Sequence, residues 1–166
     1  IVGYYALVEK LFYAFTSIGG LVSQTIYPYM SRTKDLKFLK KILLLAVIIT
    51  VPLLLILIYF NETFLMMVFA VKNEMVSNIF SIVFSGALFS IVSSIIGYPF
   101  LAAFGYPKYA NNSLIYSSLI YLIYILIILQ ITNDIYYISF SLVIYMLSGL
   151  LFRIYFIKKT QIFNNE

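Results

Sequence analysis

The sequence contains no cysteine and no histidine, and it has few charged residues. It therefore offers no disulfide, no Cys/His zinc site, no thiol nucleophile and no imidazole base, so we expect no metal site, no cofactor and no enzymatic activity. Only 10% of the 166 residues are charged, whereas a soluble domain carries about 25%. Acid/base chemistry would depend on six carboxylates, of which only Glu9 lies inside an apolar run.

Hydrophobic residues, by contrast, make up 63% of the chain, and its mean hydropathy is +1.02. A soluble domain of this size buries only about 70% of its chain's surface and could not cover so much apolar area. A lipid bilayer removes this conflict, so we predict an integral membrane protein. The net charge of +5 does not indicate a nucleic-acid partner, because no basic stripe is interleaved with aromatic residues on a polar element.

Long apolar stretches predict the fold class. Each is long enough to span a hydrocarbon core about 30 Å thick, which needs roughly 20 helical residues. None shows the roughly ten-residue alternation of a membrane β-barrel, so we predict an all-α protein of about five transmembrane helices. The predicted helices are 2–30, 42–60, 76–104, 114–131 and 135–157. The segment 62–75 is too short to span, and is interpreted either as a short interfacial helix or as an extension of its neighbours.

Basic residues are concentrated on one side of the predicted helices. Nine of them fall in the first loop, the third loop and the tail: Arg32, Lys34, Lys37, Lys40, Lys41, Lys108, Arg153, Lys158 and Lys159. The opposite side carries Lys72 together with Glu62, Glu74 and Asp134. Because positively charged loops stay in the cytoplasm, we expect a cytoplasmic C-terminus with a tail over 158–166.

The first predicted helix is polar along one side. At about 100° per residue, its polar side chains and glycine cover an arc of roughly 140°, and the opposite face is apolar. A membrane-crossing helix of this kind is expected to face the interior of a bundle or a watery cavity. The residues expected to line that cavity are Glu9, Lys10, Tyr13, Ser17, Gly20, Gln24 and Tyr27.

Two of these residues are charged, which matters because a charge at the centre of a membrane helix costs about 2.5–3.5 kcal/mol. Glu9 and Lys10 are adjacent and point about 100° apart, so each is expected to meet another helix or water rather than its neighbour. For Lys10 an alternative stays open. It lies about 12 Å from the start of the helix, at 1.5 Å per residue, and could extend its ammonium to the membrane surface.

Two further groups of residues suggest specific contacts. Small residues at Gly86, Ser90, Ser93 and Gly97 lie within roughly 60° of arc and favour close helix packing. The basic loop 32–41 is interpreted mainly as a topology determinant and a contact to anionic membrane lipids. Within it, Arg32 and Lys34 are candidates for contacting a phosphate headgroup, because arginine binds phosphate through two parallel hydrogen bonds and lysine provides a point charge.

Parts of the sequence resemble a known family. Residues 2–11 (VGYYALVEKL) and 27–31 (YPYMS) resemble the VGxYxxAxK…(L/Y)xPxxS segment of polysaccharide-unit flippases, the O-antigen transporter group of the multidrug/oligosaccharidyl-lipid/polysaccharide exporter superfamily. Residues 94–109 are similar to the family's LxxxxGxxxLxAxGxxKxY stretch. The chain departs from the pattern at Val8, where a small residue is usual, and at Pro99, where a polar residue is common.

The resemblance implies a function and a larger architecture. Members of the family have about a dozen helices in two lobes that rock to give alternating access. The chain would then be the C-terminal part of a longer protein in a bacterial cytoplasmic (inner) membrane, forming most of one lobe, with the missing N-terminal lobe as its partner. The implied activity is flipping of undecaprenyl-pyrophosphate-linked oligosaccharide for surface polysaccharide biosynthesis.

Other functions fit the sequence less well. A drug/cation antiporter of the same superfamily would need a buried acidic residue, and Glu9 is the one carboxylate available in the predicted helices. A membrane polysaccharide polymerase or acyltransferase would need a large polar external loop, yet the longest one has only Glu62, Lys72 and Glu74 as charged residues. A purely structural subunit would not need a polar-faced first helix. The flippase is therefore the favoured prediction.

Overall fold

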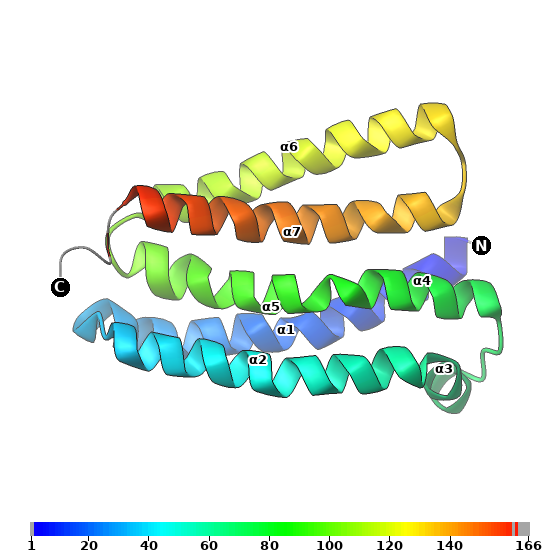
Figure 1. The fold of residues 1–166 in the computed structure, drawn as a ribbon, viewed down its shortest axis with the longest axis horizontal. Helices are drawn as coiled ribbons and strands as arrows, with labels where there is room; N and C mark the ends of the chain where they lie inside the picture. Colours follow the sequence, from blue (N-terminus) through cyan, green and yellow to red (C-terminus); the bar gives the residue numbers. More distant parts are fainter. Residues whose placement is uncertain (1, 161, 163–166) are drawn as a thin grey trace.

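The computed structural model describes residues 2–160 and 162, and its secondary structure is helical, with no strand among those residues. The elements are α1 (Val2–Thr33), α2 (Leu36–Tyr59), α3 (Asn61–Phe69), α4 (Glu74–Ser85), α5 (Ala87–Ile96), the π-helix η1 (Gly97–Ala102), α6 (Pro107–Ile131) and α7 (Ile135–Lys159). Figure 1 shows the long helices running side by side along one axis. Of the predicted tail 158–166, residues 161 and 163–166 lie outside the described part.

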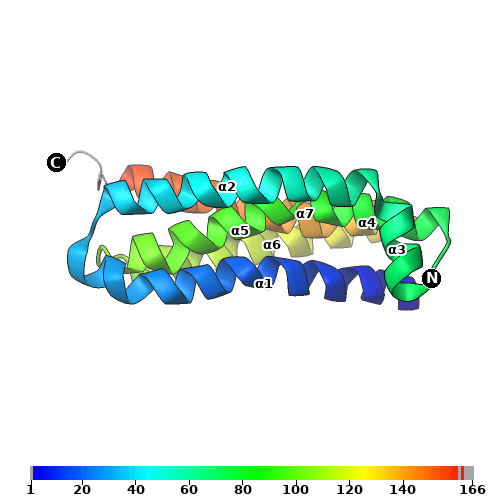
Figure 2. The same cartoon turned by 90° about the horizontal axis from the view of Figure 1, so that it is seen from below.

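The structure confirms five helices long and apolar enough to cross a membrane, each overlapping one predicted stretch. The third of these spans is not one regular helix, because α4 and α5 meet at Gly86 and the final turn widens into η1 at Gly97. Pro99 lies in that wider turn, where its missing N–H leaves a gap in the ordinary helical hydrogen bonding. The segment 62–75 contains the short helix α3, which lies across one end of the bundle (Figure 2).

Short polar side chains begin three of the helices. Asp35 accepts a hydrogen bond from the backbone N–H of Phe38 at 2.9 Å, and so caps α2. Asn73 caps α4 and Asp134 caps α7 in the same way, each accepting a 2.9 Å hydrogen bond from a backbone N–H two residues later. Each cap satisfies one of the free N–H groups at a helix start. The short connections before α2 and α7 place α1 antiparallel to α2 and α6 antiparallel to α7 (Figure 1).

The span α4–α5–η1 is the centre of the bundle. In its most apolar window 56% of residues are buried, against 6% for α6. Helix α1 packs against α4, α5 and η1, while α7 packs against α4, α5 and α6. Helices α1 and α7 therefore flank α5 on two sides, as Figures 1 and 2 show.

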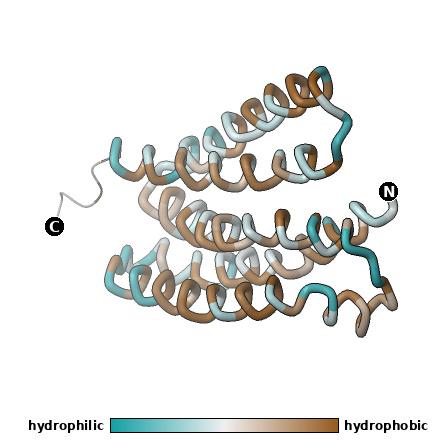
Figure 3. Tube along the Cα trace, turned by 45° about the vertical axis from the view of Figure 1, so that its right-hand side comes forward, coloured by the Kyte–Doolittle hydropathy of each residue, from teal (hydrophilic) through white to brown (hydrophobic). Residues whose placement is uncertain are grey.

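The outward faces of the peripheral helices are apolar. Large exposed side chains of α2 and α6 include Leu44, Leu45, Ile48, Ile49, Leu53, Ile115, Leu119, Leu122, Ile123 and Leu126. Polar residues gather toward the ends of the helices and in the connections (Figure 3). An apolar girdle of this kind is unfavourable in water and favourable in hydrocarbon, so the fold is compatible with a multi-pass membrane protein.

Two apolar clusters hold the bundle together at its two ends. One contains Phe12, Phe80 and Phe84, with the rings of Phe80 and Phe84 stacked 3.9 Å apart between centroids. The other contains Met30 and Phe100 and lies toward the opposite ends of the same helices. Along α1 the two clusters meet at Phe15, which packs against both of them.

Charged residues are separated between the two ends of the bundle. The α1–α2 connection, the turn before α6 and the end of α7 lie together (Figure 1) and carry eight of the eleven basic residues: Arg32, Lys34, Lys37, Lys40, Lys41, Lys108, Lys158 and Lys159. We call this the basic end. The other end carries Lys72 with three carboxylates. The prediction was wrong for Arg153, which belongs to neither end because it is buried between helices.

The charge separation predicts that the basic end faces the cytoplasm. Green fluorescent protein fused after the C-terminus is therefore expected to fluoresce, and alkaline phosphatase fused in the α6–α7 turn is expected to be active outside. Whole-cell fluorescence and phosphatase activity measure the two fusions. A dark C-terminal fusion at normal expression, together with an inactive α6–α7 fusion, would reverse the orientation.

Candidate functional site

Arg153 is a charged residue that is buried between helices. It lies on α7 and is only 6% exposed. Its Nε donates a hydrogen bond to the Ser113 hydroxyl of α6 at 3.1 Å, and its Nη1 donates to the backbone carbonyl of Ser93 on α5. One guanidinium therefore connects three helices.

Small residues make room for this guanidinium. A Cβ added at Gly97 would lie 2.8 Å from Nη1 of Arg153, which is closer than real Cβ contacts. On α7 itself, a Cβ at Gly149 would lie 3.6 Å from the Ser117 hydroxyl of α6, an ordinary contact. The predicted small-residue stripe faces α7 at Gly86, where a Cβ would lie 3.4 Å from the Cα of Val143, and at Gly97.

The side chain of Arg153 extends toward the middle of the bundle, not toward the nearer surface. The residue is six positions before the end of α7, or about 9 Å at 1.5 Å per residue. Helical side chains lean toward the N-terminus of their helix, which for α7 means away from the basic end. Its partner Ser93 lies nine residues before the end of η1. An arginine that reached for the membrane surface would point the other way.

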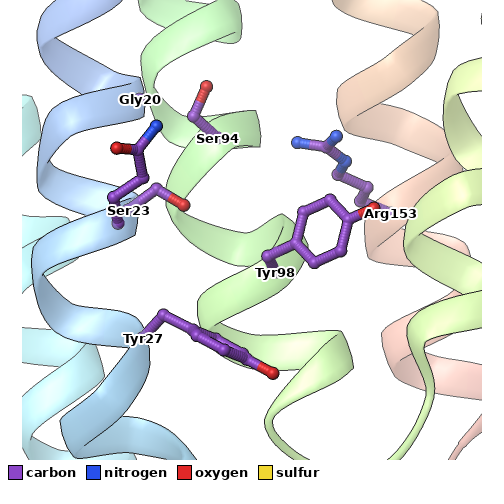
Figure 4. A pocket seen from close by; sticks show the side chains of 7 residues that line it. Gly20, Ser23, Tyr27, Ser94, Tyr98 and Arg153 are labelled. Atoms are coloured by element: carbon purple, nitrogen blue, oxygen red, sulfur yellow. The ribbon is translucent and has the colours of Figure 1, made fainter.

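A cavity of about 330 Å³ lies beside Arg153. Its walls come from three helical segments: α1, the α5–η1 span and α7 (Figure 4). The lining residues are Gly20, Ser23, Gln24, Tyr27, Ser94, Tyr98 and Arg153. In Figure 4 the guanidinium of Arg153 points across the cavity from α7 toward α5. The cavity thus has hydroxyl and amide groups along two walls and a cation on the third.

Two further cavities continue from the first along the bundle. The second, of about 230 Å³, shares Ser94 and Arg153 with the first and adds Ser90, Ser117 and Tyr145 among its lining residues. The third, of about 290 Å³, shares Tyr13 and Tyr145 with the second; its lining residues are Glu9, Tyr13, Ser118, Tyr121, Leu142 and Tyr145. Neighbouring cavities share lining residues and so lie next to one another, and we call the three cavities together the polar groove. It runs from Tyr27 to Glu9.

The residues predicted on the polar side of α1 fall into two groups. Gly20, Gln24 and Tyr27 line the first cavity, Glu9 lines the third, and Tyr13 lines the second and third. Lys10 and Ser17 line none of these three cavities and are exposed. The hydroxyl of Ser17 donates to the carbonyl of Ala14 at 2.6 Å, within its own helix.

The two predicted phosphate contacts, Arg32 and Lys34, lie at the basic end and outside the polar groove. Lys34 has a left-handed backbone, with φ of 51°, and its ammonium lies 5.9 Å from the centroid of the Phe104 ring. Its position is therefore fixed partly by the turn between α1 and α2. Both side chains are exposed, where a cation interacts weakly with anions because of water and salt.

Sequence reasoning missed Arg153, Ser94 and Tyr98 as groove residues. From the sequence, Arg153 was grouped with the basic residues of the tail, Lys158 and Lys159. One signal for burial was available: Leu150 to Ile157 is apolar on both sides of the arginine, so the charge interrupts a membrane span. The partners Ser93 and Ser113 lie 60 and 40 residues away in the sequence, and no local pattern indicates them.

The chain has no match among protein-family models, curated proteins or solved structures. Within residues 2–160 and 162, no group of three or more acidic side chains is arranged to hold a metal ion. The polar groove presents hydroxyl groups, an amide, aromatic rings, one guanidinium and, in the third cavity, the carboxylate of Glu9. These groups bind by hydrogen bonding, by stacking and by charge.

The contact between Gly97 and Arg153 predicts a specific effect on stability. In Gly97→Ala the new methyl group would displace the guanidinium from Ser93 or Ser113, at a cost of about 1–3 kcal/mol for a buried charged donor left unpaired. Thermal unfolding of the protein in detergent, followed by circular dichroism, measures the change.

Gly20→Ala is the matched control, because no atom lies within 4 Å of a Cβ at that position. It should leave the unfolding temperature unchanged or raise it slightly, since alanine favours helix by about 0.5–1 kcal/mol over glycine. Equal unfolding temperatures for Gly97→Ala and Gly20→Ala would contradict the packing described here.

Proposed function

We propose that this chain forms part of a membrane transporter that flips a lipid-linked oligosaccharide, an undecaprenyl-pyrophosphate-linked sugar chain, for surface polysaccharide biosynthesis. The observation that carries the proposal is the polar groove inside a bundle whose outer surface is apolar. A lipid-linked oligosaccharide is likewise divided into a polar part, its hydrophilic head, and an apolar part, its long hydrocarbon tail. The head would occupy the groove while the tail stays in the bilayer.

The groove offers groups suited to sugars. Gln24 provides an amide, Ser23 and Ser94 provide hydroxyls, and the tyrosines provide hydroxyls and ring faces. Tyr27 and Tyr98 are 38% and 45% exposed, so their side chains are accessible to a ligand. At about 330 Å³ the first cavity is at the lower limit of the roughly 300–1,000 Å³ of typical ligand sites. It would hold one part of a larger headgroup, with the neighbouring cavities taking the rest.

The groove is open along one side of the bundle, which supports a two-lobe arrangement. On α1, Tyr13, Ser17 and Gln24 are exposed although they belong to an apolar-surfaced helical bundle. Polar side chains at membrane depth are costly against lipid and favourable against a cavity or another helix. A second lobe, the proposed N-terminal part, would cover this side. Rocking of the two lobes would then open the groove to each membrane face in turn.

Deletion of the gene that encodes this chain tests the proposal. If the protein flips lipid-linked oligosaccharide, its loss should stop surface polysaccharide and leave the lipid-linked precursor facing the cytoplasm. Surface polysaccharide is measured by gel electrophoresis, and the precursor by mass spectrometry after labelling from each side of the membrane. Re-expression of the unaltered gene should restore export.

The same strain separates the flippase from the antiporter. Unchanged surface polysaccharide with increased sensitivity to cationic drugs would contradict the flippase and favour a drug/cation antiporter. In that case Glu9, which is half-buried and lines the third cavity, would be the carboxylate available for ion coupling. Unchanged polysaccharide with unchanged drug sensitivity would remove both assignments.

A further inference from the structure

The positive charge of Arg153 is not neutralised by the protein around it. Within residues 2–160 and 162, its hydrogen-bond partners are the hydroxyl of Ser113 and the backbone carbonyl of Ser93, and no carboxylate pairs with it. Buried charges in proteins are normally paired, because removing an ion from water without a counter-charge is expensive. The charge at membrane depth therefore needs a function or a missing partner.

The guanidinium also has donors left over. It carries five N–H groups, and its hydrogen bonds to Ser113 and Ser93 use one on Nε and one on Nη1. Among the described residues, every fully buried side-chain nitrogen has a hydrogen-bond partner. The Nη2 group of Arg153 has no acceptor among these residues, so it is not fully buried and is open to the cavities. Arg153 lines both the first and the second cavity. The free edge of the guanidinium fork thus faces the polar groove.

The surroundings favour an anion there. The first and second cavities have no carboxylate among their lining residues, and Glu9 lies in the third. Ser23, Gln24 and Tyr27 line the first cavity with groups that can donate hydrogen bonds to oxygen. The hydroxyls of Ser94 and Tyr98 already donate within the protein, to the backbone carbonyl of Ser90 at 2.9 Å and to the side-chain oxygen of Asn111 at 2.5 Å. An entering anion would meet one cation and several neutral donors, and no negative charge.

We propose that Arg153 binds the phosphate oxygens of the substrate inside the polar groove, where Gln24 lines the same cavity, and that the loop residues Arg32 and Lys34 do not form the phosphate site. This inference rests on the proposed function and names the part of the substrate that the first cavity receives. A guanidinium binds phosphate through two parallel N–H···O bonds, and its hydrogen bonds to Ser93 and Ser113 hold the fork in a fixed position.

A purely structural role explains less of the geometry. Connecting α5, α6 and α7 requires only neutral hydrogen-bond donors, which glutamine or asparagine would supply without the cost of burying a charge. The fold also reserves space for the full guanidinium, since Gly97 has no side chain where a Cβ would lie 2.8 Å from Nη1. Charge, space and cavity coincide at one residue. An anion-binding site accounts for all of them.

The test measures ligand binding to the protein in nanodiscs of uncharged lipid. The probes are undecaprenyl diphosphate, undecaprenol, which has the same tail without phosphate, and inorganic pyrophosphate. In Arg153→Gln the affinity for undecaprenyl diphosphate should fall at least about tenfold, or about 1.4 kcal/mol. Arg153→Lys should lie between the two, because lysine keeps the charge and loses the fork. Affinity for undecaprenol should be the same in all variants.

Two further variants separate binding from folding. Lys37→Gln is the matched control, because it removes one exposed cation at the basic end, and its affinity should change less than about twofold. Gly97→Ala keeps the charge and shifts the guanidinium, so it should also weaken the binding of undecaprenyl diphosphate. This variant tests the phosphate site if the Arg153→Gln protein does not fold. Thermal unfolding without ligand establishes which variants are folded.

The outcomes test the phosphate site at Arg153 separately from the flippase function on which it rests. If Arg153→Gln and Gly97→Ala bind undecaprenyl diphosphate as tightly as the unaltered protein, the phosphate site is elsewhere and the inference is overturned, while the flippase proposal stands. If the unaltered protein binds undecaprenyl diphosphate no better than undecaprenol, both fail. If it binds inorganic pyrophosphate as tightly as the lipid, Arg153 is an anion site and the lipid-linked substrate is refuted.

Discussion

The structure depends on one constraint: a guanidinium buried at membrane depth must have hydrogen-bond partners and space. Ser113 and the carbonyl of Ser93 supply the partners, and Gly97 supplies the space. These contacts join α5, α6 and α7 at one point, beside the apolar cluster that contains Met30 and Phe100. Apolar packing alone would hold helices together anywhere along their length. The arginine fixes where three of them meet, and a polar groove begins there.

The protein has a polar groove and an apolar outer surface, just as an amphiphilic substrate has a polar head and an apolar tail. Peripheral helices α2 and α6 present leucine and isoleucine outward, which requires hydrocarbon around them. The inner sides of α1, α5 and α7 present hydroxyls, an amide and a cation to the groove. Such a division supports movement of a polar head through the protein beside a tail that stays in lipid.

Much of the fold could be predicted from the sequence, because the spacing of apolar runs and polar connections is local information. All five spans follow from it, and so does the polar side of α1, whereas the sequence left segment 62–75 open between a short helix and an extension of its neighbours. The site could be predicted only in part. Lys10 and Ser17 share the helical arc of Gly20 and Gln24, yet only the latter two line the first cavity, because that depends on where α5 and α7 approach α1. Arg153 was misplaced because its burial likewise depends on where other helices, α5 and α6, approach α7.

The central claim is that the polar groove is wet while the bundle lies in the membrane. Because the sequence has no cysteine, single cysteines at Gly20, Gln24 and Ser94 can be labelled without removing any native thiol. In intact membranes these positions should react with a water-soluble maleimide much faster than cysteines at the outward-facing Leu45 and Ile48 of α2. Equally slow labelling at all five positions would show that the groove faces acyl chains and would contradict the account.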